Sequence, residues 1–539
     1  MENNVIQFNK DDKFYFKKGS DFLREGKISK AIDYFFKAKK MCKGEELYFL
    51  YFMLAQAYYF NKNFELSNLY YFMSLKEELI TQSVLRGLGE NFAVQGDVIL
   101  ARFYLNQCAN LGQTIIGQSA KERLKTLEDF QPKFFVIDGE KSDNVTLDNA
   151  RIFMSEGKFA QAIELYEENG NFSSQEIRSE LALAYFFENE SQKTLKLIKT
   201  FGTDSVSDLC NLLLVHHATG DIENYEIICQ KLRSKNLSNE EDKFKIGLTF
   251  AQTGRLDLAL VYMEEFISKN VTDIEFEFYY IIALINDGQF EKAKRLLINL
   301  KKINPLDNYI FDYYLRLCNR AEKYKLEYVF SLPLKDASKI QSKIKGYIVM
   351  SLAELKNVFL ENIDFFYYYI LKTPPASTKN LLLLKLATLE GEKFDEFFDV
   401  ILLSDRIKTN LKNSIAMKRA NLDFTAVIAL TKENVYSKII LPNMQVTRAN
   451  NIHLHSAVLK SVDYILNELP PLSVTLCKVV TKIERRINSD NVRDDVLACF
   501  LCFKSLKNFR LTTLSKICRH FKVLQQELYK FLDDYDFEV

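Results

Sequence analysis

The chain has 539 residues, of which 47% are hydrophobic and 27% are charged, a composition typical of globular proteins. A chain of this length must form several domains or a repeat array. Its 72 basic and 71 acidic side chains almost cancel, which excludes a chain-wide attraction to nucleic acid or to an anionic membrane. Only 8 prolines and 18 glycines interrupt the chain, so long helices are favoured over a β-rich fold.

The nine cysteines stand mostly in apolar helical patterns such as residues 498–503, which predicts buried, reduced thiols. The first residues show no basic segment followed by an apolar one, so no secretory signal is expected. The richest apolar run, Leu47 to Ala55, is too short to span a bilayer. We therefore expect a cytoplasmic protein that does not interact with a membrane.

A short phrase recurs between Gly26 and Glu322: a turn residue, often glycine, then polar and apolar residues, and alanine five positions after the turn. The copies with both residues are Gly26 with Ala31, Gly96 with Ala101, Gly157 with Ala162, Gly254 with Ala259, and Gly288 with Ala293. Degenerate copies have their turns at Lys62, Asn189, Gly220 and Glu322. The differences between successive turn positions are 36, 34, 61, 32, 31, 34, 34 and 34, so one spacing dominates.

A second set of residues precedes the turns, with a small residue seven positions upstream and a large one four positions upstream. The clearest pairs are Gly19 with Phe22, Gly89 with Phe92, and Gly247 with Phe250. Residues three apart lie on one face of a helix. We therefore expect the small residue to let a second helix approach closely, while the aromatic ring fills the space beside it.

Together these residues resemble the tetratricopeptide repeat (TPR), a pair of helices that repeats every ~34 residues, and the whole chain is similar to bacterial TPR proteins. Pro305 matches the closing proline of the family, whereas its early tryptophan is absent because the chain has no Trp. The resemblance implies an all-α superhelical solenoid, with about three repeats in 1–130, a linker at 131–149 and about six repeats in 150–335. Whether the superhelix is continuous across 111–149 is left open.

The second half is less regular. Residues 336–450 predict irregular helices with a small β-hairpin near 424–441, where two β-rich runs flank a short turn. Residues 451–539 predict a C-terminal helical module, with helices at 453–468, 472–488, 491–507, 511–521 and 525–534. The last two helices, joined by Lys522-Val523-Leu524, are similar to a helix-turn-helix, and those before them to a cyclin-like module.

A basic stretch in this module carries no acidic residue between its first and last members. Its six side chains, candidates for contact with nucleic acid, are Lys504, Lys507, Arg510, Lys516, Arg519 and Lys522. Against that interpretation, Lys522 replaces the usual turn glycine, Glu527 lies in the would-be recognition helix, and the chain ends with an acidic run. A solvated basic face or a protein-docking module is the favoured alternative.

No motif for catalysis or for a cofactor is present: phosphate-binding loop, nucleophile elbow and zinc-protease helix are all missing. Cys499 and Cys502 have the spacing of a zinc knuckle but lie within an apolar helix, so we expect buried thiols and no metal. The TPR resemblance implies a non-catalytic scaffold that binds a protein or peptide on its concave surface. The alternative is a peptide- or protein-sensing regulator whose C-terminal module binds nucleic acid.

The binding surface itself gives two indications. The Lys and Asn set by which TPR co-chaperones hold a terminal carboxylate has no counterpart on the expected first helices. Aromatic residues are dense around Tyr48–Tyr59 and Tyr70–Phe72, which fits either the core between repeats or an apolar groove for an amphipathic peptide.

Overall fold

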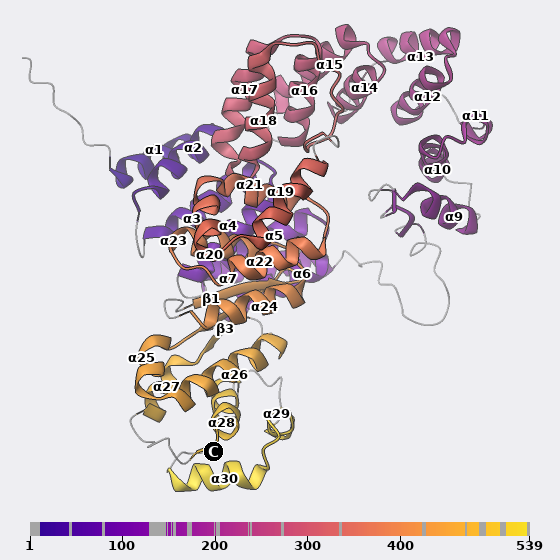
Figure 1. Ribbon diagram of the computed structural model, residues 1–539. Coiled ribbons are helices and arrows are strands. Elements are labelled where there is room, and N and C mark those ends of the chain that lie inside the picture. Colours follow the sequence, from indigo (N-terminus) through magenta and orange to yellow (C-terminus); the bar gives the residue numbers. More distant parts are fainter. Residues whose placement is uncertain are drawn as a thin grey trace, which may run out of the picture. The chain divides into compact units, whose positions relative to one another are not determined.

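The computed structural model describes most of the chain. The described residues are 11–42, 46–77, 81–128, 147, 149–151, 153–154, 158–169, 175–198, 200, 205–235, 237, 240–270, 274–333, 337–422, 427–468, 472–484, 492–506 and 514–535. The chain forms two compact units. Unit 1 comprises Met1–Asp129, Lys302–Ile310 and Leu334–Val539, and unit 2 comprises Phe130–Lys301 and Phe311–Pro333. The expected all-α fold built of helix pairs, with a small β insertion, is confirmed (Figure 1).

Unit 1 begins with three helix pairs and one further helix. These are α1 (Asp12–Arg24) with α2 (Ile28–Lys39), α3 (Glu46–Phe60) with α4 (Phe64–Glu77), α5 (Gln82–Val94) with α6 (Val98–Asn110), and then α7 (Ile115–Glu128). The side chain of Asp11 caps α1 by accepting from the backbone N–H of Phe14 (2.8 Å), and Asp97 caps α6 in the same way. The first and second helices of each pair pack against each other, as the repeat pattern predicts.

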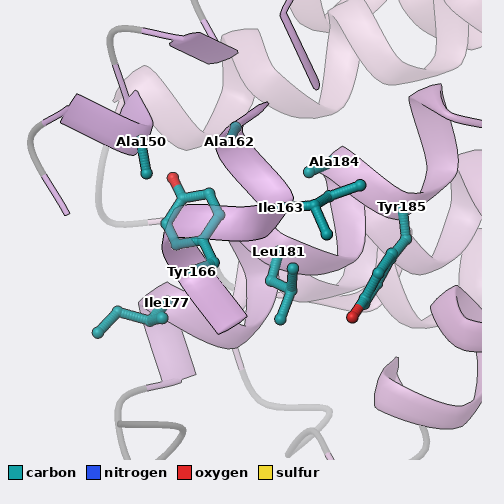
Figure 2. Close-up of a cluster of buried hydrophobic side chains, with 8 residues drawn as sticks. All are labelled: Ala150, Ala162, Ile163, Tyr166, Ile177, Leu181, Ala184 and Tyr185. Carbon is teal, nitrogen blue, oxygen red and sulfur yellow. The ribbon is translucent and has the colours of Figure 1, made fainter. Parts of the chain in front are cut away.

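Unit 2 contains the remaining pairs. Its helices are α9 (Phe159–Asn169), α10 (Gln175–Phe187), α11 (Ser191–Ile198), α12 (Val206–Thr219), α13 (Ile222–Ser234), α14 (Glu240–Gln252), α15 (Leu256–Asn270) and α16 (Ile274–Asn286), while α17 (Phe290–Ile303) and α18 (Asn308–Arg320) run across the unit boundary. Figure 2 shows how α9 and α10 pack, with Ile163 and Tyr166 of one helix beside Leu181 and Ala184 of the other. Each pair thus buries one apolar face against its neighbours.

The second half of unit 1 consists of shorter helices and one sheet. The helices are α19 (Ala337–Val349), α20 (Leu352–Glu361), α21 (Ile363–Lys372), α22 (Ser377–Leu386), α23 (Glu392–Leu403), α24 (Thr409–Ala420), α25 (Met444–Asn450), α26 (Ile452–Glu468), α27 (Cys477–Glu484), α28 (Asp494–Leu506), α29 (Leu514–His520) and α30 (Gln525–Asp534), with a short 3₁₀ turn, η1, at Pro305–Asp307. A capping box between Ser351 and Glu354 begins α20.

The predicted hairpin is present. Strand β1 (Val427–Lys432) pairs antiparallel with β2 (Val435–Ile440), and Val427 lies opposite Ile440. Glu433 and Asn434 both have positive φ, of 48° and 62°, which is the two-residue turn whose twist suits a hairpin. The buried Lys412 of α24 holds β1 by donating to the carbonyl and the hydroxyl of Thr431 (2.7 and 2.9 Å).

Two of the sequence predictions are wrong. The predicted helix at 472–488 begins only at Cys477, because residues 472–475 form strand β3 (Leu472–Thr475), which pairs parallel with β2. The repeat spacing also predicts a turn at Glu322 followed by a second helix. Instead, Ala321 takes the positive φ (52°), and residues 322–333 contain no helix. The last pair therefore lacks its second helix.

Candidate protein-binding surfaces

The turns predicted between paired helices share one backbone conformation. Positive φ occurs at Gly26, Lys62, Gly96, Asn189, Gly220, Gly254 and Gly288, between 55° and 84°. Glycine adopts this conformation without the steric cost borne by other residues, and asparagine tolerates it better than most. Gly157 lies outside the described residues, so its turn is not part of this comparison.

Three of the small residues lie where two helices approach closely. A Cβ atom added to Gly19 would lie 2.6 Å from the ring of Phe35, and one added to Gly89 would lie 2.6 Å from Cγ of Leu105. At Gly247 the nearest atom would be Cγ of Met263, at 2.9 Å. These distances are too short for a side chain, so only glycine lets the first helix of each pair approach the second this closely.

Most of the other predicted TPR anchors are buried. Ala31, Ala101, Ala162, Ala259 and Ala293 are fully buried, as is Phe250; Phe92 is almost so, and Phe22 is half-buried. Pro305 begins the 3₁₀ turn η1. The anchors are therefore part of the framework, and a binding surface has to come from side chains that pair packing leaves uncovered.

One such surface lies on the first helices of unit 1. A cavity of about 410 Å³ opens there, between α3, α5 and α7, and we call it the first-helix pocket. Its residues are Phe52, Gln56, Tyr59, Phe60, Tyr71, Ser83, Arg86, Gly87, Glu90 and Ile116. Half of these residues are aromatic or aliphatic, and Phe60 is 55% exposed. Uncovered aromatic rings beside a cavity are typical of surfaces that bind another molecule.

The polar side of the first-helix pocket is organised around Glu90. Its carboxylate lies 3.1 Å from Nε of Arg123 and 4.0 Å from the guanidinium of Arg86. Tyr71 reaches the pocket from α4 because Gly87 leaves room for it: a Cβ at Gly87 would overlap the Tyr71 hydroxyl oxygen. Burial raises the pKa of Tyr71 well above its ordinary value, so its hydroxyl stays neutral. The pocket therefore combines an apolar wall with hydrogen-bonding groups of both signs.

The second helices of the same pairs are covered by the rest of unit 1. All residues from Leu66 to Leu75 of α4 are buried. Phe72 stacks on Tyr436 of the hairpin (ring centroids 5.9 Å apart). Tyr104 of α6 donates to the carbonyl of Asn434 (2.5 Å) and accepts from the N–H of Tyr436 (3.0 Å). Some of the aromatic density around Tyr70–Phe72 is thus used for packing within unit 1.

Charged side chains also connect α4 to the second half of unit 1. Lys76 of α4 lies 2.5 Å from Asp399 of α23, and Arg406 forms a two-pronged pair with Glu65 (2.8 and 2.7 Å). Lys438 donates to the carbonyls of Leu75 and Lys76 at the end of α4 (3.2 and 2.6 Å). Much of the second helices α4 and α6 is therefore covered within unit 1, whereas the first-helix pocket is open to a partner.

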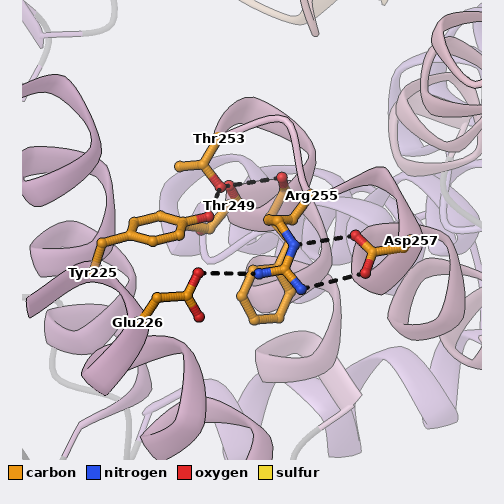
Figure 3. Close-up of polar contacts among 7 residues, drawn as sticks. Tyr225, Glu226, Thr249, Thr253, Arg255 and Asp257 are labelled. Atoms are coloured by element: carbon orange, nitrogen blue, oxygen red, sulfur yellow. Dashed lines mark hydrogen bonds and ion pairs between the residues drawn. The ribbon is translucent and has the colours of Figure 1, made fainter. Parts of the chain in front are cut away.

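In unit 2, polar contacts connect successive pairs. Tyr225 of α13 donates to the hydroxyl of Thr253 (3.0 Å), which in turn donates to the carbonyl of Thr249 (Figure 3). Arg255 bonds Asp257 through two nitrogens (3.2 and 3.3 Å) and reaches Glu226 of α13 at 3.5 Å (Figure 3). The Arg255 contacts thus connect the start of α15 to α13 of the preceding pair.

Glu277 of α16 gives a pH-dependent prediction, since burial raises its pKa to about 7. A raised pKa means that the folded protein disfavours the ionised form. The destabilising contribution of Glu277 is therefore largest above pH 7 and falls as the pH decreases towards the ordinary pKa of 4.5. Glu277→Gln is therefore expected to stabilise α16 by about 1–3 kcal/mol at pH 8 and by much less at pH 5. Hydrogen exchange of the α16 amides, corrected for the intrinsic rate, measures this. Equal effects at both pH values, or the same effect from the exposed control Glu223→Gln, would contradict it.

The predicted nucleic-acid residues are only partly described. Lys507 and Arg510 lie outside the described residues. Lys516 forms an ion pair with Glu468 (2.7 Å). Arg519 and Lys522 lie in and just after α29, and Lys522 has the positive φ (54°) for which a helix-turn-helix usually employs glycine. Lys504 also makes contacts within the protein.

Three cysteines of this module, Cys499, Cys502 and Cys518, are buried, whereas Cys477 is partly exposed. Cys499 and Cys502 lie inside α28, and Sγ of Cys499 is 3.5 Å from Sγ of Cys518. Burial raises the pKa values of the Cys499 and Cys502 thiols far above the ordinary value, so both thiols stay protonated. His520 packs against Tyr464 (ring centroids 4.7 Å apart).

Two further observations concern the described part of the chain. Asp12, Cys42 and Glu46 form a group of three potential metal ligands, but burial raises the pKa of Cys42 to about 11, so its thiol is neutral. Within the same described residues, no helix is both long and apolar enough to cross a membrane.

Comparison with known proteins gives the following. No family model matches the chain, and no curated protein matches it. Among the solved structures that align with it is the TPR domain of P58(IPK), with 13% identity over 76% of this chain and 96% of that chain and a TM-score of 0.21. Yeast Tom70 aligns with 14% identity over 93% of this chain and 99% of that chain, with a TM-score of 0.27.

Naa15/Naa10 bound to HypK-THB aligns with 10% identity over 98% of this chain and 80% of that chain, with a TM-score of 0.20. TM-scores this low do not show that these proteins and this chain arrange their helices in the same way. The similarity of the C-terminal module to a cyclin-like module stays a prediction. The TPR architecture predicted from the sequence rests on this chain's own helix pairs, on its turns with positive φ and on their regular spacing.

Proposed function

We propose that the protein is a non-catalytic scaffold that binds a protein or peptide partner on the first-helix side of its repeats. The observation that supports this most directly is the first-helix pocket, a cavity of about 410 Å³ with four aromatic side chains among its ten lining residues. Packing within the pair of α3 and α4 leaves Phe60 uncovered beside this cavity, since its side chain is 55% exposed. An apolar side chain of a partner would bury itself here, with Arg86, Glu90 and Tyr71 available for hydrogen bonds.

The expected ligand is a short polypeptide with one apolar anchor side chain. Burial of such a side chain contributes about 1.5–3 kcal/mol, which is enough to dominate the affinity of a small interface. Glu90 pairs with Arg123 and lies near Arg86, so the polar rim carries groups of both signs. Binding in this pocket does not require the terminal carboxylate of the partner, in contrast to binding by the carboxylate clamp of TPR co-chaperones.

The test uses peptides selected from a display library against the full chain. Phe60→Glu is expected to weaken the binding of peptides that use the pocket at least tenfold, because a carboxylate replaces an apolar contact. Phe60 is 55% exposed in the free protein, so the change should leave folding intact. Affinity is measured by fluorescence anisotropy with labelled peptides.

The matched control is Ile99→Glu, which places the same charge at a 65% exposed position on the second helix α6. This variant is expected to bind as the wild type does. Selected peptides that bind wild type, Phe60→Glu and Ile99→Glu equally would show that the pocket is not the binding surface.

The alternative function, a peptide- or protein-sensing regulator whose C-terminal module binds nucleic acid, stays a prediction. Its candidate contacts include Lys507 and Arg510, which lie outside the described residues. The pairing of Lys516 with Glu468 reduces the charge available to phosphates. We therefore favour the scaffold.

A further inference from the structure

The segment that follows α18, residues 322–333, takes the place of an expected helix, and we call it the strap. Its side chains alternate in burial: Tyr324, Leu326, Tyr328 and Phe330 are partly buried, whereas Lys325, Glu327 and Val329 are exposed. Alternation with a period of two is the pattern of an extended chain lying on a surface. The strap therefore lies against unit 2 in the manner of a bound peptide.

Asn286, at the end of α16, holds the backbone of the strap at one residue. Its side-chain nitrogen donates to the carbonyl of Leu326 (3.0 Å), and its side-chain oxygen accepts from the N–H of Leu326 (2.8 Å). One amide side chain thus satisfies both backbone groups of a single residue, as a neighbouring strand would. The same nitrogen also donates to the hydroxyl of Tyr328 (3.3 Å), so Asn286 contacts the backbone of one strap residue and the side chain two positions later.

Further along the strap, an aromatic site receives Phe330. Its ring centroid is 4.7 Å from that of Phe278 in α16 and 6.1 Å from that of Phe311 in α18. Next to it, Tyr314 donates to the carbonyl of Ser331 (2.9 Å). The strap is thus held by a backbone clamp, an aromatic site four positions later and a second backbone bond, all from the first helices α16 and α18.

Beside the strap lies a cavity of about 830 Å³. Strap residues 324–329 form one wall, and the other wall includes Asn286 together with His217, Gln252, Thr253 and Leu256 from the preceding pairs. The strap therefore covers only part of a surface that continues along the ends of earlier first helices. A longer extended peptide could occupy both the strap position and this cavity.

From these contacts we infer that the strap is an intramolecular stand-in for a partner: an extended peptide with apolar or aromatic side chains at alternate positions, whose backbone Asn286 clamps. This rests on the proposed function and extends it to unit 2. Release of the strap would break no helix or strand, since residues 322–333 form neither. A tethered segment competes at an effective concentration of about millimolar, so the site is inhibited until the strap is released.

The experiment uses a fluorescein-labelled peptide with the sequence of residues 322–333 as the probe, added to the full chain. Wild type is expected to bind it weakly because its own strap occupies the site. Phe330→Ala and, separately, Leu326→Pro should each bind the probe at least tenfold more tightly. The first change removes the aromatic anchor from the tethered strap, and the second removes the N–H that donates to Asn286. Lys323→Ala, at an exposed strap position that does not line the cavity, should behave as wild type.

A second change tests the clamp. Adding Asn286→Ala to the Leu326→Pro variant should abolish the gain in probe binding, while circular dichroism remains that of wild type. The inference is overturned if the folded strap variants bind the probe no better than wild type, or if Asn286→Ala leaves the gain intact. Should Phe330→Ala fail to fold, Leu326→Pro decides the question. Phe60→Glu should not change probe binding, so failure here and failure at the first-helix pocket are distinguishable.

Discussion

Tyr436→Ala is expected to destabilise unit 1 by about 3–5 kcal/mol, the range for deleting a large buried ring. Tyr436 is fully buried in β2 and stacks on Phe72 of α4, which lies far earlier in the chain. The loss should therefore appear in the N-terminal helices as well as in the hairpin. Hydrogen exchange of the α4 and α6 amides in the full chain should become faster, while the amides of α12 in unit 2 keep the wild-type rate.

Tyr436→Phe is the matched control. Within the described residues the hydroxyl of Tyr436 is buried without a hydrogen-bond partner, so its removal should be neutral or slightly stabilising. A protein in which Tyr436→Ala accelerates exchange in the hairpin but not in α4 would show that the hairpin does not support the N-terminal repeats.

Gly89→Val is expected to destabilise unit 1 by about 2–3 kcal/mol because the added atoms overlap the partner helix. The Cβ alone would lie 2.6 Å from Cγ of Leu105 and 3.4 Å from the carbonyl oxygen of Ala101, and the second of these is backbone that cannot turn away. The pair α5 and α6 would have to separate. The free energy of opening, measured by hydrogen exchange of the α5 amides, should fall accordingly.

Gly346→Ala provides the opposite control in the same unit. Gly346 lies within α19, and a Cβ there would meet no atom within 4 Å. Alanine should therefore stabilise this helix by about 0.5–1 kcal/mol through its higher helix propensity. A stabilising Gly89→Val would contradict the close contact assigned to Gly89.

The repeat framework could be predicted from the sequence because it is local. Gly254 and Gly288 mark turns that need a positive φ, and alanine five positions later marks the contact that follows, so both can be recognised from short stretches of sequence. The hairpin could be predicted for the same reason, since its strands and its turn, Glu433-Asn434, are adjacent in the sequence.

What the sequence did not reveal depends on partners distant in the chain. The apolar residues on all sides of α4 indicate burial on more than one face, but not that Tyr436 covers Phe72. Strand β3 follows Pro470-Pro471, where the local pattern predicts a helix, since its pairing with β2 depends on residues in an earlier part of the chain. Tertiary pairing here overrides local propensity.

The strap could have been recognised from its alternating side chains, but the regular spacing of the preceding turns favoured another helix pair at this position. Tyr324, Leu326, Tyr328 and Phe330 alternate with outward residues, and Glu327 stands where the repeat would place alanine. A period of two at a position where the repeat predicts a second helix indicates extended chain. Asn286 could not have been recognised, because its role depends on the strap passing beside it.

The cover that the hairpin gives to α4 has a consequence for biosynthesis. At a ribosomal rate of about 5–20 residues per second, roughly 20–70 s separate the emergence of Phe72 from that of Tyr436. During that interval the apolar side of α4 that faces the finished hairpin has no cover of its own, so the nascent chain presents an aggregation-prone helix early. Chaperone engagement, or slow translation of the middle of the message, would decide how much of the protein escapes aggregation.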